Sequence, residues 1–244
     1  MTESAPFYLS VVIPAYNEEK RISKILDSIS QYQQKHTSEM EVIVVIDASS
    51  DGTEEITRSY SGRIKNLKVI VGVKNIGKGG AIAGGVKEAR GQYILFADAD
   101  NSTPFEQVDN LLKYANDFGV VIASRYCKGG KLLIPQPFSR RIGGRALNLL
   151  VQSILLPGLK DTQCGFKLFK AELAKVIFAK MTINRWSFDL EILAIARYLG
   201  AKIKEVGVIW LDNPHSRVNP IRDGVQMIKD AWTIKRNIRQ DLYK

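Results

Sequence analysis

The feature that most constrains the fold is the alternation of short β-rich runs with amphipathic stretches through residues 1–124. Five runs are rich in Val and Ile and apolar almost throughout, as expected of strands covered on both faces. They are Leu9–Ile13, Glu41–Ile46, Leu67–Gly72, Tyr93–Ala97 and Val120–Ser124. The stretches between them have a helical pattern: Glu18–Gln33, Thr53–Tyr60, Gly79–Ala89 and Pro104–Asn116. Such alternation predicts right-handed βαβ units, a mostly parallel central sheet and an α/β fold.

The second half of the chain has a different pattern. We expect a helix over Ser139–Leu155 with a basic start and an apolar end, and a second helix over Phe188–Tyr198. A strand over Lys202–Trp210 and a basic amphipathic helix over Asn219–Asp241 follow. Because no repeat, low-complexity tract or linker interrupts the sequence, we expect a single domain across residues 1–244 with a C-terminal elaboration.

The charge of the chain predicts an anionic partner. Thirty-five basic residues against 25 acidic ones give a net charge of +10, and the stretch from Arg125 to Lys160 has no Asp or Glu. Nucleic acid, a membrane surface and a phosphorylated substrate are the three candidates. The longest apolar run, Ala146–Leu159, is too short to cross a bilayer, and the N-terminus does not have the pattern of a signal peptide. Two cysteines without metal-ligand spacing indicate a reducing compartment.

Polar residues follow three of the predicted strands. They form the segments Pro14–Glu18, Asp47–Thr53 and Asp98–Asp100. Ligands of open α/β sheets bind beyond the carboxyl ends of the strands, so these segments are candidates for one binding site. Asp51 and Thr53 have a second interpretation, since both residue types are common at the start of a helix.

The Asp98-Ala99-Asp100 segment is the sharpest chemical signal. Two carboxylates just beyond a buried strand would repel each other unless a cation lay between them. Hard oxygen ligands suit Mg²⁺ or Mn²⁺, which usually completes its coordination with substrate phosphate oxygens. Two other nucleotide motifs are excluded. No strand is followed by G-x-G-x-x-G, and Gly79 stands where a P-loop needs Ser or Thr. Lys78 among its glycines remains suited to a phosphate contact.

These segments together resemble the family 2 glycosyltransferases of the GT-A fold, a Rossmann-like nucleotide-diphospho-sugar transferase fold. The resemblance covers Val11 to about Ile238 and includes four N-terminal signatures: VVIPAYNEE, a D-x-S-x-D-G-T segment, NIGKGGA and DAD. The later segments SRY, DTQCGFKLF and RWSFDLE are most similar to enzymes that glycosylate a polyprenyl phosphate. Among these, the dolichyl-phosphate β-glucosyltransferases are the most similar and the dolichyl-phosphate mannose synthases come next.

The resemblance implies roles for individual residues. The nucleotide-sugar contacts are implied for Pro14, Ala15, Tyr16, Glu18, Asp47, Lys78, Asp98 and Gln163. Asp98 and Asp100 would bind the metal, and Arg125, Arg140 and Arg145 would bind the acceptor phosphate. Ser216 and Arg217 are similar to a segment that closes over the diphosphate. The implied divisions are a nucleotide-sugar half (1–124), an acceptor half (125–218) and a basic interfacial helix (219–244). Ser102 replaces a family glutamine, which weakens the case for a third metal ligand.

The general base is an open question at this stage. A sugar hydroxyl acceptor needs one, whereas a phosphate acceptor is already anionic and needs only to be positioned. Asp189 is the candidate base, and we expect Glu191 to form a buried structural ion pair because residues two apart on a helix do not share a face. Asp161 and Gln163 would lie beside the donor sugar by resemblance.

The sequence therefore predicts inverting, metal-dependent transfer of a hexose to a polyprenyl or dolichyl phosphate at the cytoplasmic membrane face. UDP-glucose is the favoured donor, and GDP-mannose is an alternative because spacing does not distinguish the two bases or sugars. A hydroxyl acceptor on a polysaccharide or glycolipid is the next alternative, and nucleic-acid binding is remote because no recognition motif accompanies the charge. A peripheral membrane location fits the C-terminal helix, where the apolar residues near one face are Ile221, Val225, Ile228, Trp232 and Ile238. The alternative is a helix packed on the core with a solvated basic face. We expect Trp186 and Trp210 to be core residues.

Overall fold

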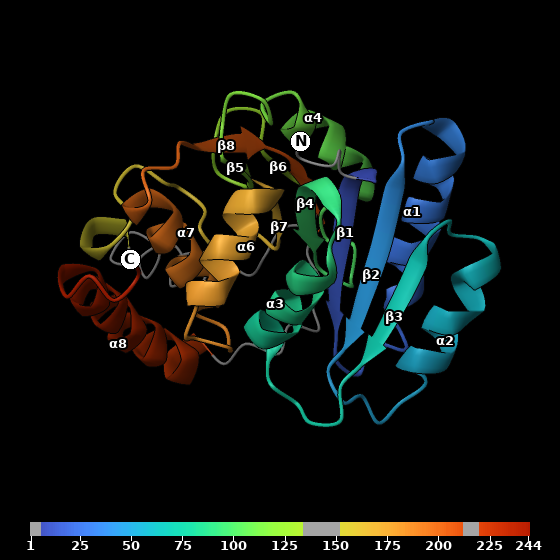
Figure 1. Cartoon of the computed structure of the whole chain (residues 1–244), viewed down its shortest axis with the longest axis horizontal. Helices are drawn as coiled ribbons and strands as arrows, with labels where there is room; N and C mark the ends of the chain where they lie inside the picture. Colours follow the sequence, from blue (N-terminus) through green and yellow to red (C-terminus); the bar gives the residue numbers. More distant parts are fainter. Residues whose placement is uncertain (1–5, 134–151, 212–219) are drawn as a thin grey trace.

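A seven-stranded sheet forms the centre of the computed structural model, which describes residues 6–133, 152–211 and 220–244. Its strands are β1 (Phe7–Ala15), β2 (Met40–Ile46), β3 (Leu67–Val71), β4 (Gly91–Ala97), β5 (Val120–Ser124), β7 (Phe166–Lys170) and β8 (Ile203–Gly207). Their order is β3-β2-β1-β4-β7-β5-β8, and only β7 runs antiparallel to its neighbours (Figure 1). The short strands β6 (Lys131–Leu132) and β9 (Ile209–Trp210) pair separately.

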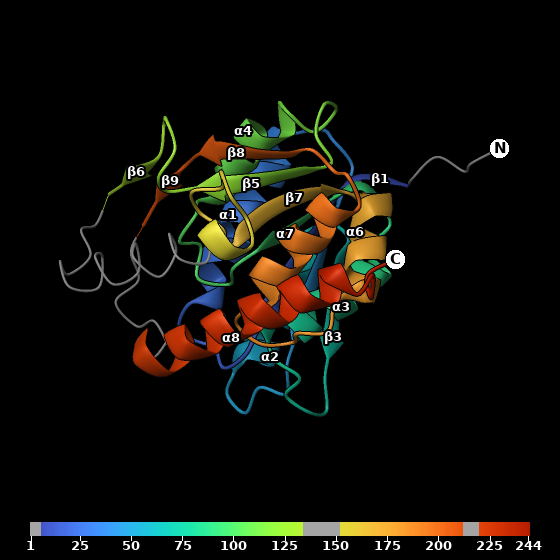
Figure 2. The same cartoon turned by 90° about the vertical axis from the view of Figure 1, so that its left-hand side faces the viewer.

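Helices cover both faces of the sheet, as its apolar strands require (Figures 1 and 2). One face carries α1 (Ile22–Lys35), α2 (Thr53–Ser59), α4 (Val108–Leu112) and the 3-10 helices η1 (Tyr60–Gly62) and η2 (Phe105–Gln107). The other carries α3 (Lys78–Glu88), α6 (Ala171–Lys180), α7 (Phe188–Tyr198) and α8 (Pro220–Arg239). Successive strand residues serve opposite cores: Val11 and Val44 pack toward the α1 side, and Val12 and Val45 toward the α3 side.

The predicted α/β class and mostly parallel sheet are confirmed, and the main differences lie at element ends and at β7. The helix expected from Glu18 begins at Ile22 because hydrogen bonds to the 49–53 loop occupy the preceding residues. The stretch expected as one strand from Lys202 divides into β8 and β9. The sequence analysis did not predict β7 or α6. The buried charge of Lys167 interrupts the apolar pattern of β7.

The C-terminal helix α8 packs against the α7 side of the molecule with one face and leaves another exposed (Figure 2). Its buried face consists of Met227, Ala231 and Ile234, which the sequence analysis did not single out. Val225 and Trp232 are exposed, as are Lys229, Arg236 and Arg239. Within the described ranges, no helix combines the length and apolarity needed to cross a bilayer.

Candidate active site at the carboxyl ends of the strands

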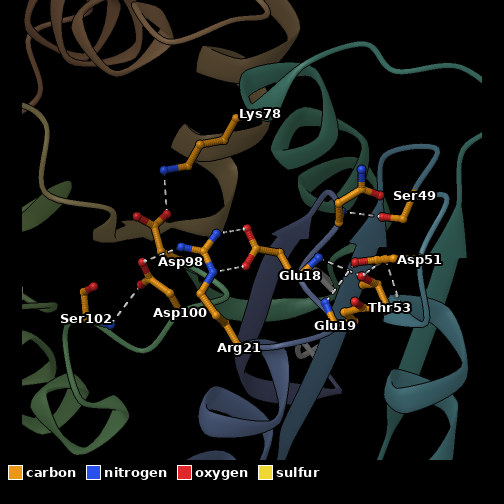
Figure 3. Close-up of polar contacts among 11 residues, drawn as sticks. Glu18, Glu19, Arg21, Ser49, Asp51, Thr53, Lys78, Asp98, Asp100 and Ser102 are labelled. Atoms are coloured by element: carbon orange, nitrogen blue, oxygen red, sulfur yellow. Dashed lines mark hydrogen bonds and ion pairs between the residues drawn. The ribbon is translucent and has the colours of Figure 1, made fainter. Parts of the chain in front are cut away.

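The polar segments after β1 and β2 are joined directly by hydrogen bonds. The Asn17 amide N–H donates to Ser49 Oγ (2.9 Å), and the Ser50 amide N–H donates to Asn17 Oδ1 (2.8 Å). The Glu18 amide N–H donates to Thr53 Oγ1 at 2.7 Å. These two predicted clusters therefore form a single structural unit (Figure 3).

Asp51 stabilises this unit rather than facing a ligand. Its carboxylate accepts hydrogen bonds from the amide and hydroxyl of Thr53 (3.1 and 2.5 Å) and from the Glu19 amide (3.2 Å). Burial acts to raise the pKa of Asp51, but these hydrogen bonds outweigh it and hold the pKa below its ordinary value. Both residues lie at the start of α2, where Thr53 is the first helical residue and Asp51 accepts a hydrogen bond from its amide, but the N-cap position itself is Gly52.

Arg21 connects the β1 segment to the acidic segment after β4. Its guanidinium binds Glu18 through two hydrogen bonds of 2.5 and 2.6 Å, and its Nη1 lies 3.9 Å from Asp100 Oδ2. All three predicted segments thus meet, and the third does so through a residue that the sequence analysis missed (Figure 3). The available sequence signal was the position of Arg21 three residues after Glu18, because side chains at this spacing are neighbours on a helix surface.

Lys78 and Asp98 form the centre of the site. Lys78 is the first residue of α3, and its Nζ lies 2.5 Å from Asp98 Oδ1 (Figure 3). The Asp98 amide donates to the Gly165 carbonyl (3.0 Å), and a Cβ at Gly165 would overlap the Asp98 carboxylate, so this position requires glycine. Asp100 accepts a hydrogen bond from the Ser102 amide at 3.0 Å.

Asp47 positions Lys78 by fixing the loop before α3. Its two carboxylate oxygens accept hydrogen bonds from the amides of Ile76 and Gly77, both at 2.8 Å. Gly77 adopts a φ of +92°, which favours glycine, and α3 begins at the next residue. The buried carboxylate is thus committed to backbone amides, and its predicted contact with the nucleotide stays a prediction.

Among the described residues, the paired charges grouped around Lys78 and Asp98 leave a negative excess. Glu18, Asp98, Asp100 and Asp189 carry four negative charges, and Arg21, Lys78 and Lys167 carry three positive ones. Burial, Asp100 and Asp189 raise the pKa of Asp98, and they prevail over the opposing effect of Lys78. Burial acts to lower the pKa of Lys78, but Asp98, Asp189 and Asp100 outweigh it and raise that pKa. The cluster accommodates a further cation.

A divalent metal fits the two carboxylates of Asp98 and Asp100. The donor atoms are hard oxygens, and the Lys78 ammonium beside Asp98 demonstrates that a positive charge is stable at this position. Among the described residues, no group of three or more His, Cys, Asp or Glu side chains could hold a metal. Two carboxylates completed by phosphate oxygens are a usual arrangement for Mg²⁺.

Asp189 and Glu191, the candidates in α7, are both buried and both make structural contacts. Asp189 pairs with the Lys167 ammonium, which also donates to the Cys164 carbonyl at 2.7 Å. Glu191 accepts hydrogen bonds from Thr182 (3.0 and 2.6 Å), the Ile183 amide (2.7 Å) and the Tyr243 hydroxyl (2.7 Å). Glu191 is thus a hydrogen-bonded structural carboxylate, and neutral donors replace the ion pair that we expected.

Arg125 and Asp161 form a second charged site on the β5 side. Arg125 donates from Nε and Nη2 to the two Asp161 carboxylate oxygens, at 2.7 and 2.9 Å. Its guanidinium also lies 5.3 Å from the Tyr126 ring and 5.1 Å from the Trp210 ring. Asp161 therefore holds Arg125, the predicted phosphate-binding residue, in a fixed orientation. This contact does not test the expected position of Asp161 beside the donor sugar.

The remaining predicted site residues within the described ranges lie at the end of β1 and next to α8. Pro14 and Ala15 are buried at the end of β1, whereas Tyr16 is exposed. Gln163 Nε2 lies 3.2 Å from the sulfur of Met227 in α8, which connects the C-terminal helix to this region. The predictions for Arg140, Arg145, Ser216 and Arg217 lie outside the described residues.

Trp186 is not a core residue, contrary to expectation. Its side chain is 43% exposed, and its ring lies 6.0 Å from the Lys78 ammonium. The polar neighbours Asn184, Arg185 and Ser187 were the available signal, because they place the indole in a loop rather than on an apolar helix face.

Comparison with known proteins gives one consistent family. The profile of glycosyl transferase family 2 matches residues 10–178. Dolichyl-phosphate β-glucosyltransferases of Dictyostelium discoideum and Homo sapiens are each 36% identical over 241 residues, covering 93% of this chain and 74% of theirs. The Saccharomyces cerevisiae enzyme of the same name is 31% identical over 256 residues, covering 97% of this chain and 77% of its own.

Solved structures support the fold at lower identity. Mannosyl-3-phosphoglycerate synthase from Rubrobacter xylanophilus has a TM-score of 0.70 at 20% identity, covering 96% of this chain and 75% of its own. Glucosyl-3-phosphoglycerate synthase from Mycobacterium tuberculosis, in complex with Mn²⁺, UDP and glucosyl-3-phosphoglycerate, has a TM-score of 0.67 at 21% identity. That match covers 96% of this chain and 80% of the other.

Proposed function

Because this chain belongs to glycosyl transferase family 2, we propose that it transfers glucose from UDP-glucose to the phosphate of a dolichyl or other polyprenyl phosphate. The observation that carries the choice of acceptor is the buried pair between Asp189 and Lys167. In this pair the Asp189 carboxylate contacts the Lys167 ammonium, so the geometry commits it to a buried structural contact rather than to an acceptor hydroxyl. A phosphate acceptor needs no base, so it suits a site in which this carboxylate is committed.

The donor end of the reaction uses the residues after β4. Asp98 and Asp100 would hold Mg²⁺ or Mn²⁺ against the donor diphosphate. The ion, when bound, neutralises the charge that develops on the diphosphate as its bond to the hexose breaks. Lys78 lies against Asp98 and would bind the diphosphate as a second cation. Asp47 keeps Lys78 in place through the loop before α3.

The acceptor end uses the β5 side. One edge of the Arg125 guanidinium is bound to Asp161, and the other edge would bind the acceptor phosphate. An oxygen of that phosphate attacks the anomeric carbon as the bond from this carbon to UDP breaks. The products are a glucosyl phosphate lipid and UDP, and no proton has to be removed from the nucleophile.

The exposed face of α8 supports a peripheral location at the cytoplasmic face of a membrane. Val225 and Trp232 lie exposed beside Lys229, Arg236 and Arg239. An indole and a valine flanked by basic side chains suit the boundary between anionic head groups and acyl chains. The buried face of the same helix, with Met227 next to Gln163, connects this surface to the site.

Radiolabel transfer to a polyprenyl phosphate tests the proposal. UDP-glucose and GDP-mannose are supplied in parallel with Mn²⁺, and label is measured in the organic phase with and without chelator. We expect label from UDP-glucose only, and its loss with chelator. Label from GDP-mannose alone would identify mannose, rather than glucose, as the transferred sugar. No label from either donor, with UDP still bound, would move the acceptor to a sugar hydroxyl.

A further inference from the structure

Trp186 is an exposed aromatic side chain that lies next to the reaction centre and has no part in the reaction as proposed above. Its ring centroid is 6.0 Å from Lys78 Nζ, and the same nitrogen is 2.5 Å from Asp98 Oδ1. Phe188 lies at the same distance from this ammonium but is completely buried. An indole that is 43% exposed leaves a large apolar surface in water, which burial against a ligand would stabilise.

The backbone that carries Trp186 is fixed on one side by α3. The Asn184 carbonyl accepts hydrogen bonds from the amides of Gly79 (2.9 Å) and Gly80 (3.3 Å). A Cβ at Gly77 would lie 2.5 Å from that carbonyl, and one at Gly79 would lie 2.6 Å from Phe188 Cβ. Glycine at these two positions therefore permits a close approach of the 184–188 segment to the start of α3.

The same segment is fixed on its other side by Glu191. This buried carboxylate accepts hydrogen bonds from the amides of Thr182 and Ile183, at 3.0 and 2.7 Å. Residues 182–184 of the loop between α6 and α7 are thus held by α3 and by Glu191. At the other end of the loop, the Phe188 amide donates to the Arg185 carbonyl at 3.1 Å, so both ends of the backbone around Trp186 are supported. An aromatic ring held in this way loses little conformational entropy when a ligand packs on it.

The position of Trp186 matches the donor hexose rather than the acceptor. The hexose is bonded to the β-phosphate, and the groups proposed to hold the diphosphate, Lys78 and Asp98, are the ones beside this indole. The acceptor side has its own aromatic residues, because Tyr126 and Trp210 flank Arg125. Glucose has only equatorial hydroxyl groups on C2 to C4, so the faces of its ring present C–H groups that pack well on an aromatic surface.

We propose that Trp186 is a hexose-binding residue whose indole packs against the C–H face of the donor sugar. This inference rests on the proposed function in assuming a nucleotide-sugar donor. It adds a specificity role, since an axial hydroxyl such as the C4 hydroxyl of galactose changes the shape and polarity of the face offered to the ring.

Binding of UDP-glucose and of UDP, each with Mn²⁺, tests this role in Trp186→Ala. We expect the ratio of the UDP-glucose Kd to the UDP Kd to rise roughly two- to tenfold, with the UDP Kd unchanged. Trp186→Phe should recover part of the change. The thermal midpoint should stay at the wild-type value, because the side chain is exposed. Trp210→Phe and Trp232→Phe are the matched controls and should leave the ratio unchanged.

Tryptophan fluorescence gives a second readout without activity. The Trp210→Phe/Trp232→Phe double variant retains Trp186 as its single tryptophan, since the chain has three. We expect UDP-glucose to change the emission more than UDP does, and UDP-galactose to have a smaller effect than UDP-glucose.

Two results would overturn the inference. One is an unchanged Kd ratio in Trp186→Ala, and the other is a rise in the KM for polyprenyl phosphate alone, which would assign the indole to the acceptor. Both measurements of donor binding are independent of the acceptor. A wild-type chain that binds UDP-glucose but transfers nothing to polyprenyl phosphate would therefore refute the proposed function and leave the Trp186 inference to be judged by its own ratio.

Discussion

The molecule contains two kinds of carboxylate–cation pair, and they differ in how far they are open to solvent. The Lys78 and Asp98 side chains remain 21% and 34% exposed. The Lys167 and Asp189 side chains are 0% and 7% exposed. In the Arg125–Asp161 pair the carboxylate is 1% exposed and the guanidinium 17%, so this pair is closed on the carboxylate side. A partly exposed pair exchanges its partners for a metal ion or a diphosphate, because water stabilises each group during the exchange. A buried pair is confined to its partner. We therefore expect the open pair to be the one that takes part in the proposed reaction.

Breaking the closed pair should have the largest effect on stability. Lys167→Met leaves the Asp189 charge buried without its partner, so we expect the free energy of unfolding to fall by about 3–5 kcal/mol. Urea denaturation measures this change. Lys78→Met is the matched control at the open pair and should cost much less. An equal loss of stability in both variants would remove the distinction between the two pairs.

Changing the open pair should affect catalysis instead. We expect Asp98→Asn and Asp100→Asn to lower turnover by on the order of 10²–10³-fold, with the thermal midpoint nearly unchanged. Mn²⁺ binding in the presence of UDP, followed by EPR, should weaken in both. Asp51→Asn is the control, because the hydrogen bonds of that carboxylate go to Thr53 and the Glu19 amide, and it should retain metal binding. Normal turnover in both test variants would contradict the metal assignment.

Arg125 tests whether a closed pair can also serve a substrate. Removing this side chain alone would leave Asp161 unpaired, so the informative variant is Arg125→Met/Asp161→Asn, which removes both charges. We expect the KM for polyprenyl phosphate to rise roughly ten- to a hundredfold, as for the loss of a hydrogen bond to a charged group. The KM for the donor should rise much less than the KM for polyprenyl phosphate, because Arg125 is assigned to the acceptor. Equal changes in both constants would refute the acceptor role.

The smallest expected effect is a difference in thiol reactivity between Cys164, which lies near the buried Asp161, and Cys127. Burial, with the charge of Asp161, raises the pKa of Cys164 to about 12, whereas Cys127 is half-buried. The folded state keeps the Cys164 proton from the ordinary value of 9.0 up to about 12, and the unfolded state loses it, so this thiol disfavours folding as the pH rises through that window. Near pH 8 we expect a thiol reagent to modify one cysteine in the native chain and two after denaturation. Rapid native modification of both would show that the Cys164 region is open.

How much of this arrangement the sequence predicts depends on how far apart in the chain the interacting residues lie. The apolar strands and their following polar segments were predictable, because strand period and strand-end position are local properties. From the sequence, Lys78 and Asp98 could be expected to lie in the same site, but their direct contact could not be predicted. Its closeness depends on Asp47 and on the space at Gly165, which lie far away in the chain.

The closed pairs were not predictable from local pattern. A lysine in a short segment such as that of Lys167 is expected at the surface. Its partner Asp189 lies 22 residues later in the chain, on a different element. The antiparallel insertion of β7 between β4 and β5 buries this lysine, and no local signal specifies that insertion. Trp186 was wrongly predicted to be a core residue for a different reason, because its polar neighbours Asn184, Arg185 and Ser187 were a local signal for a loop.

The most direct test of the difference between open and closed pairs is the transfer rate of Asp189→Asn compared with that of Asp98→Asn, per mole of folded protein. Asparagine keeps the shape of the side chain in both variants and removes one negative charge. If Asp98 belongs to the reaction centre and Asp189 is structural, Asp189→Asn retains transfer to polyprenyl phosphate within about tenfold of wild type, and Asp98→Asn loses on the order of 10²–10³-fold. A folded Asp189→Asn protein as inactive as Asp98→Asn would contradict this account and make Asp189 the general base.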